Sequence, residues 1–305
     1  MNIGNDMNIT LRQLQVFLAI TQTRSITAAA ERLHLTKPAV SAALSELEKR
    51  IGNPLFDRSG NRLHLNDLGQ KLLPLADELL QRSRDIEVLF STEEVQRTSL
   101  RLGASFTIGQ QLIPWLLRDY RLDHLQPLPK VHISNTREIC QQLIAFELDI
   151  GLIEGEVEDP EIETLTWMQD RMLILANPEH PLAGIERSSQ EALEDQPWVL
   201  REPGSGSRNL FLHRMAPHLQ RWRIALELNS TEAIINATAA GLGLSCLSEL
   251  EAQYAIKSGR LVAIEVDLNL TRTFRLAWHR EKYLSPALLQ FVHYCQAWNG
   301  VANRA

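Results

Sequence analysis

The first part of the chain carries apolar residues at helical spacing in three successive segments. The stretch LRQLQVFLAI puts one apolar stripe on a helix from about Leu11 to Thr21. A second, alanine-rich helix, ITAAAERL, follows Ser25, whose hydroxyl is suited to cap it. A third helix follows Thr36, carries Pro38 in its first turn, where the missing N–H is not needed, and ends at a glycine. Its buried face is expected to consist of Val40, Leu44, Leu47 and Ile51.

The second and third helices are joined by the three-residue turn HLT, which predicts a helix-turn-helix whose second helix enters the DNA major groove. Two short strands in PLFDRSGNRLHLN, around Ser59-Gly60-Asn61, predict a basic wing. We assign residues 1–66 to this winged helix-turn-helix domain. Taken singly, its polar side chains could be ordinary solvated positions, and Arg58 could pair with Asp57 or Glu48 instead. The expected DNA contacts are Ser25, Thr27, Thr36, Lys37, Pro38, Ser41, Ser45, Arg58 and Arg62.

Residues 67–95 repeat apolar positions at alternating steps of four and three. This stripe, broken only by Arg82, predicts a long helix that pairs with the same helix of a second chain. A helix packed on its own domain is the alternative. The stretch that follows, near Ser91 to Ser99, is expected to act as a hinge. The stripe consists of Leu68, Leu72, Leu75, Leu79, Arg82, Ile86 and Leu89.

Strand-like and helix-like stretches alternate through residues 96–305. LRLGASF is followed by GQQLIPWLLRDYRL, VHISN by TREICQQLIAFEL, and WVLRE by SGSRNLFLHRMAPHL. This alternation predicts an α/β fold of parallel sheets covered by helices. RMLILANP and TFRLAWHR are expected to cross between two lobes, lobe 1 at about 100–170 and 272–300 and lobe 2 at about 171–271. The arrangement resembles the type 2 periplasmic-binding fold, which holds its ligand between the lobes.

Polar side chains gather where these strands end. In parallel α/β sheets ligands bind beyond the carboxyl ends of the strands, beside helix N-termini that attract anions. Each hydroxyl or amide there could instead be an ordinary helix cap. The acids Glu154 and Glu202 could repel an anion, bind a cation or become protonated. The expected ligand-binding residues are Ser105, Thr107, Asn135, Glu154, Arg201, Ser205, Ser207, Arg208 and Ser230.

Charge is divided unevenly along the chain. The formal charge of −6 combines about +3 through residue 66 with −9 beyond it, which favours contact of the first domain with a polyanion. We expect a cytoplasmic protein without a membrane span, because neither a signal peptide nor a long apolar run is visible. The three cysteines, Cys140, Cys246 and Cys295, fit reduced core residues, and no metal or phosphate-loop spacing is present, so no cofactor is expected.

Two long stretches, LRQLQVFLAI and SITAAAERLHLTKPAVSAALSELEKRIGNPLFDRSGNRLHLNDLGQKLLPLA, closely resemble the N-terminal module of LysR-type transcriptional regulators. The remaining residues resemble the effector domain of that family. The resemblance implies a homodimer or homotetramer that binds double-stranded DNA, contacts RNA polymerase and responds to a small effector. Lys37 stands where the family often has Gln, and Ala42 where it often has a longer polar or basic residue. Only the docking mode therefore carries over, not the base preferences.

Five stretches of the effector half are most similar to the YeiE and CysB branch of the family, which is tied to sulfur metabolism: ASFTIGQQLIP, DIGLIEG, WVLREPGSGSR, ELNSTEAI and GLGLSCLS. The leading hypothesis is thus a transcriptional regulator controlled by a small anion, such as a sulfur oxyanion or a compact carboxylate. An enzyme or a solute-binding protein on the same two-lobed scaffold is the alternative, although neither a catalytic group nor an export signal is legible. A DNA-architectural protein without a ligand is a third hypothesis.

Overall fold

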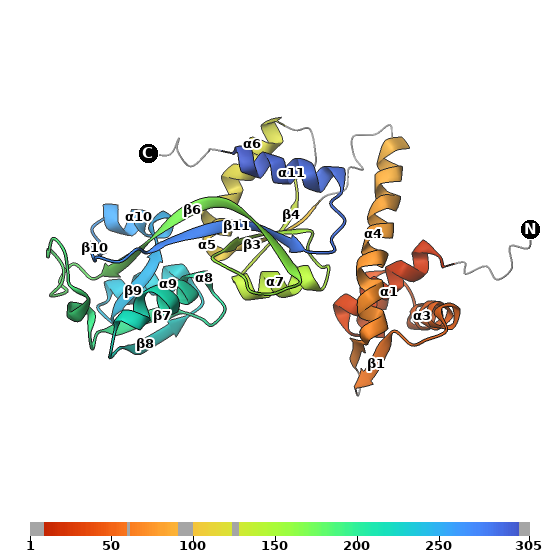
Figure 1. Cartoon of the computed structure of the whole chain (residues 1–305), viewed down its shortest axis with the longest axis horizontal. Helices are drawn as coiled ribbons and strands as arrows, with labels where there is room; N and C mark the ends of the chain where they lie inside the picture. The colour runs from red at the N-terminus through yellow and green to blue at the C-terminus, as the bar shows by residue number, and fades with distance from the viewer. Residues whose placement is uncertain (1–8, 60–61, 91–99, 124–127, 299–305) are drawn as a thin grey trace, which may run out of the picture.

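The computed structural model describes residues 9–59, 62–90, 100–123 and 128–298. It consists of an N-terminal helical domain, one long helix and a two-lobed α/β domain (Figure 1). The expected hinge at 91–99 and the tip of the wing, Gly60 and Asn61, lie outside the described residues. Within those residues, no helix is both long enough and apolar enough to cross a membrane.

The N-terminal domain, residues 9–66, is called the reader below. It contains α1 (Leu11–Thr23), α2 (Ile26–Arg32) and α3 (Lys37–Ile51), followed by the antiparallel pair β1 (Phe56–Ser59) and β2 (Arg62–Leu65). Thr10, Ser25 and Thr36 cap the three helices, each accepting a backbone N–H with its hydroxyl. The structure therefore confirms the predicted helix-turn-helix and wing strands. They could be predicted because their apolar spacing and capping residues lie close together in the sequence.

The linker helix, α4 (Asp67–Phe90), runs the length predicted for the connector up to residue 90. One face buries Leu73, Ala76 and Leu80 against the reader core. The opposite face is apolar but uncovered: among its residues, Leu75 is 56% exposed and Leu79 50% exposed. A long apolar stripe in water is unfavourable, so this face is suited to a partner helix.

One continuous sheet joins the two lobes of the C-terminal domain (Figure 1). Its path is β4-β3-β5-β11-β6-β9-β7-β8, with β10 paired to β6. The long strands β6 (Ile162–Ala176) and β11 (Thr271–His279) are antiparallel and pass from one lobe to the other. These are the two expected crossovers. The sequence suggested separate sheets, whereas the crossing strands hydrogen-bond both lobes into one.

Lobe 1 forms around strands that pair in parallel, as the alternating pattern predicted. Helices α6 and α11 cover one face of its sheet and share one apolar core. Helix α7 covers the other face over a second apolar core. The lobe contains β3 (Arg101–Ser105), α5 (Phe106–Gln111), α6 (Ile113–Asp123), β4 (Lys130–Ser134), α7 (Thr136–Ile144), β5 (Ile150–Glu154) and α11 (Pro286–Ala297).

Lobe 2 repeats this plan, with β7 parallel to both β8 and β9 and with apolar cores on both faces of the sheet. The helix expected in SGSRNLFLHRMAPHL is shorter than predicted, because α8 gives way to a π-helical turn at Phe211–Met215 and a 3₁₀ turn at Ala216–His218. The lobe contains β7 (Pro197–Arg201), α8 (Gly206–Leu210), β8 (Arg223–Leu228), α9 (Thr231–Ala239), β9 (Leu244–Ser248), α10 (Glu249–Lys257) and β10 (Val262–Ile264).

Candidate functional site: a reader surface and an interlobe cleft

The first candidate surface is the exposed face of α3. Val40, Leu44 and Leu47 point into the reader core, which leaves the opposite face to solvent. That face carries the residues expected to contact DNA: Lys37, Pro38, Ser41 and Ser45 are all exposed. Thr27 on α2 is also exposed, while Ser25 and Thr36 use their hydroxyl oxygens as helix caps and retain a hydrogen to donate.

The wing separates its two arginines. Arg58 lies opposite Leu63 and Arg62 lies opposite Ser59 in the β1–β2 ladder. Because cross-strand partners share a face and neighbouring residues alternate, Arg58 and Arg62 lie on opposite faces of this ribbon. In the described part of the chain Arg58 forms no ion pair with Asp57 or Glu48, and Glu48 instead accepts the backbone N–H of Leu55.

The second candidate site lies between the lobes, where one guanidinium is fully enclosed. Arg272 of β11 donates to a carboxylate oxygen of Glu154 at 2.5 Å and to one of Asp170 at 2.7 Å. It also donates to the hydroxyls of Thr107 at 3.1 Å and Ser207 at 3.2 Å. Glu154 and Thr107 belong to lobe 1 and Ser207 to lobe 2, so Arg272 connects the two lobes directly.

The surroundings of Arg272 control the charge of the acids beside it. Burial alone would raise the pKa of Glu154, but the charge of Arg272 holds it below its usual range. Glu154 also accepts a hydrogen bond from the backbone N–H of Thr107. Asp170 accepts a hydrogen bond from Ser248 as well, yet burial outweighs its partners and raises its pKa. The negative charge of Glu154 therefore lies at the beginning of α5, where it occupies a donor that an anion would need.

A second set of contacts joins the two lobes. Arg201 of lobe 2 forms an ion pair with Glu202 at 2.8 Å, and its guanidinium lies 4.8 Å from the ring centre of Phe106 in lobe 1. The Asn135 amide donates to Glu202 at 3.3 Å, also across the cleft. The structure therefore has its lobes in contact along this edge.

Three buried polar atoms around the cleft have no hydrogen-bond partner within the described residues: Ser105 Oγ, Thr136 Oγ1 and Glu251 Oε2. Unsatisfied polar atoms are costly in a protein interior and usually indicate a place for a ligand, ion or water. Glu251 of α10 accepts a hydrogen bond from Thr231 with its other oxygen, at 2.9 Å. Burial, together with the negative charge of Glu154, raises the pKa of Glu251 to about 7.

The residues predicted to bind the ligand differ in their partners and in their burial. Thr107, Glu154 and Ser207 meet at Arg272, and Arg201 and Asn135 meet at Glu202. Ser105 is buried at the start of α5, Ser205 caps α8 and is buried, and the exposed Ser230 caps α9. Arg208 is held by Glu227 on β8 and by the carbonyl of Arg201. All nine residues remain predicted ligand contacts.

Sequence reasoning missed Asp170, Glu251 and Arg272. A signal was present for two of them. Asp170 alternates with Met168 and Met172, and Arg272 alternates with Phe274 and Leu276, so each charge falls on the apolar face of its strand. A charge on a buried strand needs a partner. Glu251 carried no such signal, since an acid in the first turn of a helix is ordinary.

Comparison with known proteins agrees with this architecture. Residues 11–70 match the family described as bacterial regulatory helix-turn-helix protein, lysR family, and residues 93–300 match the LysR substrate binding domain. The HTH-type transcriptional regulator YeiE of Escherichia coli K12 is 39% identical over 294 residues, which cover 96% of this chain and 99% of that protein. The chain belongs to the LysR family of transcriptional regulators, whose members are DNA-binding regulators and not enzymes.

Solved structures show the same fold. Full-length OxyR from Pseudomonas aeruginosa, solved as a point variant, superimposes with a TM-score of 0.73 at 22% identity, over 96% of each chain. The regulatory domain of CcmR from Synechocystis PCC6803, solved in complex with 2-PG, has a TM-score of 0.60 at 27% identity. It covers 66% of this chain and 97% of that domain.

The raised pKa of Glu251 predicts a pH-dependent stability. Because the folded state holds this proton up to about pH 7, whereas an unfolded Glu loses it near its usual pKa of 4.5, stability falls as pH rises between these values. The Glu251→Gln variant keeps an acceptor for Thr231 but no charge. It should equal the wild type near pH 4.5 and be more stable at pH 8, by up to about 3 kcal/mol.

Thermal unfolding of the full chain between pH 4.5 and 8 checks this expectation. Glu265→Gln is the matched control, because Glu265 is an exposed acid paired with Arg171. Parallel curves of Tm against pH for the wild type and Glu251→Gln would show that Glu251 does not titrate in this range.

Proposed function

We propose that this chain is a regulator whose operator binding or activation is modulated by a small anionic effector held between the two lobes. The observation that carries this proposal is the enclosed set of hydroxyls and backbone donors around Arg272 and Glu154. Neutral hydroxyl donors suit a compact anion that must bind reversibly. A ligand that contacts both lobes favours their closed arrangement and so shifts the population of conformations.

The charge in the cleft specifies how an anion binds. Four carboxylates, Glu154, Asp170, Glu202 and Glu251, face the two guanidiniums of Arg201 and Arg272. An anion can therefore bind in one of two ways. It displaces a carboxylate from its hydrogen-bond donors, or it binds while Glu251 is protonated and neutral. Thr107 and Ser207 accept hydrogen bonds from Arg272 and still have their own hydroxyl hydrogens to donate. These donors favour a tetrahedral oxyanion or a compact carboxylate.

Two likenesses support this class of effector. The effector half is similar to the branch of the family tied to sulfur metabolism, which favours sulfite, sulfate or an O-acetylserine-type metabolite. The related CcmR regulatory domain was solved with 2-PG bound. We infer that ligand binding changes the spacing of the DNA readers in the oligomer and thereby contact with RNA polymerase.

Replacing Thr107 with Val tests the site directly, because the two side chains have nearly the same shape. The loss of one hydroxyl should weaken binding of the anion by ~1–2 kcal/mol and leave DNA binding without ligand unchanged. Calorimetry with sulfite, sulfate, thiosulfate, O-acetylserine and common carboxylates identifies the anion first. Ser285→Ala is the control, because it also removes one hydroxyl, but that hydroxyl caps α11 and is not among the predicted ligand contacts.

Equal affinity of Thr107→Val and the wild type would make Thr107 a structural residue. If none of these compounds binds the wild type, the anion hypothesis is wrong, while the assignment to a DNA-binding family is unaffected.

The exposed face of α3 and the wing are proposed to contact DNA, with Lys37 and Ser41 toward the base edges and Arg62 toward the backbone or minor groove. Lys37→Ala and Arg62→Ala should each weaken binding to a selected operator duplex by ~1–3 kcal/mol and reduce its dependence on salt. Lys130→Ala removes a positive charge from lobe 1 and should have no effect. Wild-type affinity of both variants in a gel-shift titration would contradict these contacts.

The uncovered stripe of α4 is proposed to pair with the same helix of a second chain. Leu79 is half exposed and lies on that stripe. Replacing it with Asp puts a charge into an apolar helix pair and should weaken association by several kcal/mol, at least ~3 kcal/mol if the charge is fully buried. Glu87→Asp is a conservative control at an exposed position of the same helix. Analytical ultracentrifugation that shows a full dimer for Leu79→Asp would mean that the stripe serves another contact.

A further inference from the structure

Glu251 lies at the cleft edge of lobe 2, although sequence reasoning did not single it out. It is the third residue of α10, which follows β9 directly. Because β7 is parallel to both β8 and β9, the carboxyl ends of these three strands lie at one edge of the lobe. Arg201 ends β7 and Ser230 follows β8 at this edge. Glu251 therefore shares its edge with predicted ligand contacts of lobe 2.

The two oxygens of the Glu251 carboxyl group have different surroundings. Oε1 accepts a hydrogen bond from the Thr231 hydroxyl at 2.9 Å. Oε2 is buried without a hydrogen-bond partner in the described part of the chain, and the residue as a whole is only 6% exposed. A buried carboxylate oxygen without a donor is strongly unfavourable, whereas a neutral carboxylic acid can carry its hydrogen there. The surroundings of Oε2 thus favour an O–H group that still lacks an acceptor.

The charges of the cleft favour the same neutral form. Burial is the largest effect on Glu251, and the negative charge of Glu154 across the cleft adds to it. The attraction of Arg272 and Arg201 is weaker, since both guanidiniums already form ion pairs with other carboxylates. The pKa of Glu251 therefore rises to about 7.

The elements packed against α10 supply no further cation for Glu251. These elements are β6, β9, α5 and α9, and neither β9 nor α5 contains a charged residue. Beside α10, β6 contributes the buried Asp170 and the exposed Arg171, which forms an ion pair with an acid of its own. Helix α9 contributes only Glu232, which is exposed and paired with an arginine. Of the described charges on these elements, none can therefore neutralise an ionised Glu251.

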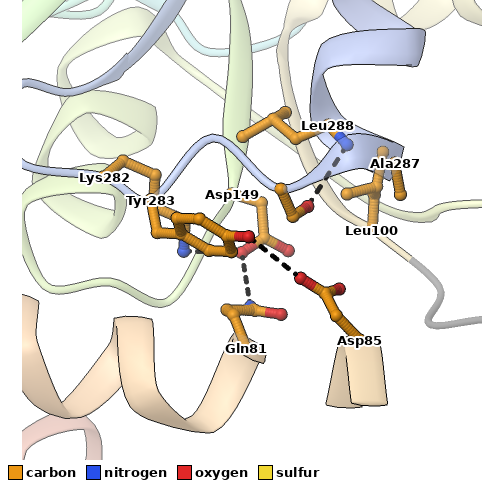
Figure 2. A pocket seen from close by; sticks show the side chains of 9 residues that line it. Gln81, Asp85, Leu100, Asp149, Lys282, Tyr283, Ala287 and Leu288 are labelled. Atoms are coloured by element: carbon orange, nitrogen blue, oxygen red, sulfur yellow. Dashed lines mark hydrogen bonds and ion pairs between the residues drawn. The ribbon is translucent and has the colours of Figure 1, made fainter. Parts of the chain in front are cut away.

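A buried acid that stays ionised has different partners in the same chain. Asp149 of lobe 1 lies 2.6 Å from Arg101 and 2.7 Å from Lys282, and Asp77 completes a closed set of two acids and two bases. Figure 2 shows Lys282 beside Asp149. Burial would raise the pKa of Asp149, but the two cations outweigh it and hold the pKa far below its usual range. The carboxyl group on α10 has only a hydroxyl where Asp149 has two cations, so its neutral form is favoured.

We propose that Glu251 determines the specificity of the cleft: it carries a proton on Oε2 and donates this hydrogen to the bound anion, so that each anion binds together with one proton. The inference rests on the proposed effector site and adds the charge state in which that site binds. A neutral Glu251 supplies a donor that a carboxylate lacks, and it removes one negative charge that would repel the anion. The anion must then present an unprotonated oxygen, as sulfate and carboxylates do.

Proton coupling makes the affinity for the anion depend on pH. Because binding requires the protonated form, affinity is greatest below the pKa of Glu251, about 7, and falls as pH rises through it. Sulfate is the probe, since its own charge does not change in this range. The wild type should bind sulfate about tenfold more weakly at pH 8.5 than at pH 6. Calorimetry of the full chain at pH 8, in Tris and in triethanolamine, should show uptake of about one proton, because these cationic buffers differ in ionisation enthalpy.

Two substitutions separate the donor from the charge. Glu251→Gln keeps an acceptor for Thr231 and a donor in place of the O–H group, but it cannot ionise. It should bind sulfate within about twofold of the wild type at pH 6, keep that affinity at pH 8.5 and take up no proton. Glu251→Met has a similar length and neither property, so it should bind about fivefold more weakly at pH 6.

Glu249→Gln is the matched control, because Glu249 is an exposed acid two residues earlier on the same helix. It should keep the pH dependence and the proton uptake of the wild type.

Infrared spectroscopy of the full chain locates the proton without any ligand. Carbon-13 labelling of the glutamate carboxyl groups separates their bands from that of Asp170, whose pKa is also raised. The C=O band of a protonated glutamic acid should be present at pH 6 and absent at pH 9. Glu251→Gln should lack this band at both values.

Three results would overturn the inference: no glutamic acid band that depends on Glu251, sulfate binding at pH 8 without proton uptake, or the same pH dependence in Glu251→Gln and the wild type. Each of them leaves the anion site itself in place. If the wild type binds no sulfate even at pH 6, the cleft is not a site for this oxyanion, and the inference is wrong together with that part of the proposed function.

Discussion

The guanidinium of Arg272 is the interaction on which the arrangement of the two lobes depends. It is enclosed where β11 crosses from one lobe to the other, and it contacts Glu154 and Thr107 on one side and Ser207 on the other. A guanidinium cannot lose its proton in a protein, so its charge must be balanced wherever the lobes move. When the cleft opens, Glu154 or Asp170 must therefore stay paired with Arg272. A ligand that enters must also leave the charge of Arg272 balanced.

The chain contains a second buried ionic cluster with a different role. Around Arg272 the partners include neutral hydroxyls that can exchange one acceptor or donor for another, and nearby polar atoms such as Glu251 Oε2 are unsatisfied within the described residues. Around Asp77 the two acids and two bases are paired with each other. Fully paired buried charges resist separation, whereas unsatisfied polar groups favour binding or rearrangement.

The cleft carries less net positive charge than a site for an anionic ligand is expected to carry. The residues predicted to attract an anion, Arg201 and Arg208, are each paired with an acid, Glu202 and Glu227. The donors that remain are hydroxyls and backbone N–H groups. Glu251 is buried beside the negative charge of Glu154, so its own ionisation is unfavourable. Selectivity in such a site comes from the shape and hydrogen bonds of the ligand more than from its net charge.

The sequence by itself determined the reader helices, their caps at Ser25 and Thr36, the wing strands and the apolar stripe of α4. These features depend on residues within one or two turns of each other, so spacing along the chain reveals them. It also singled out Thr107, Glu154 and Ser207 as predicted ligand contacts, because ligands of parallel α/β sheets bind beyond the carboxyl ends of the strands. Only the tertiary structure decided their partners: Arg272 lies 118 positions from Glu154, and Lys282 lies 205 positions from Asp77. No local pattern records which distant charge will neutralise a buried one, because that choice is made when separate elements pack together.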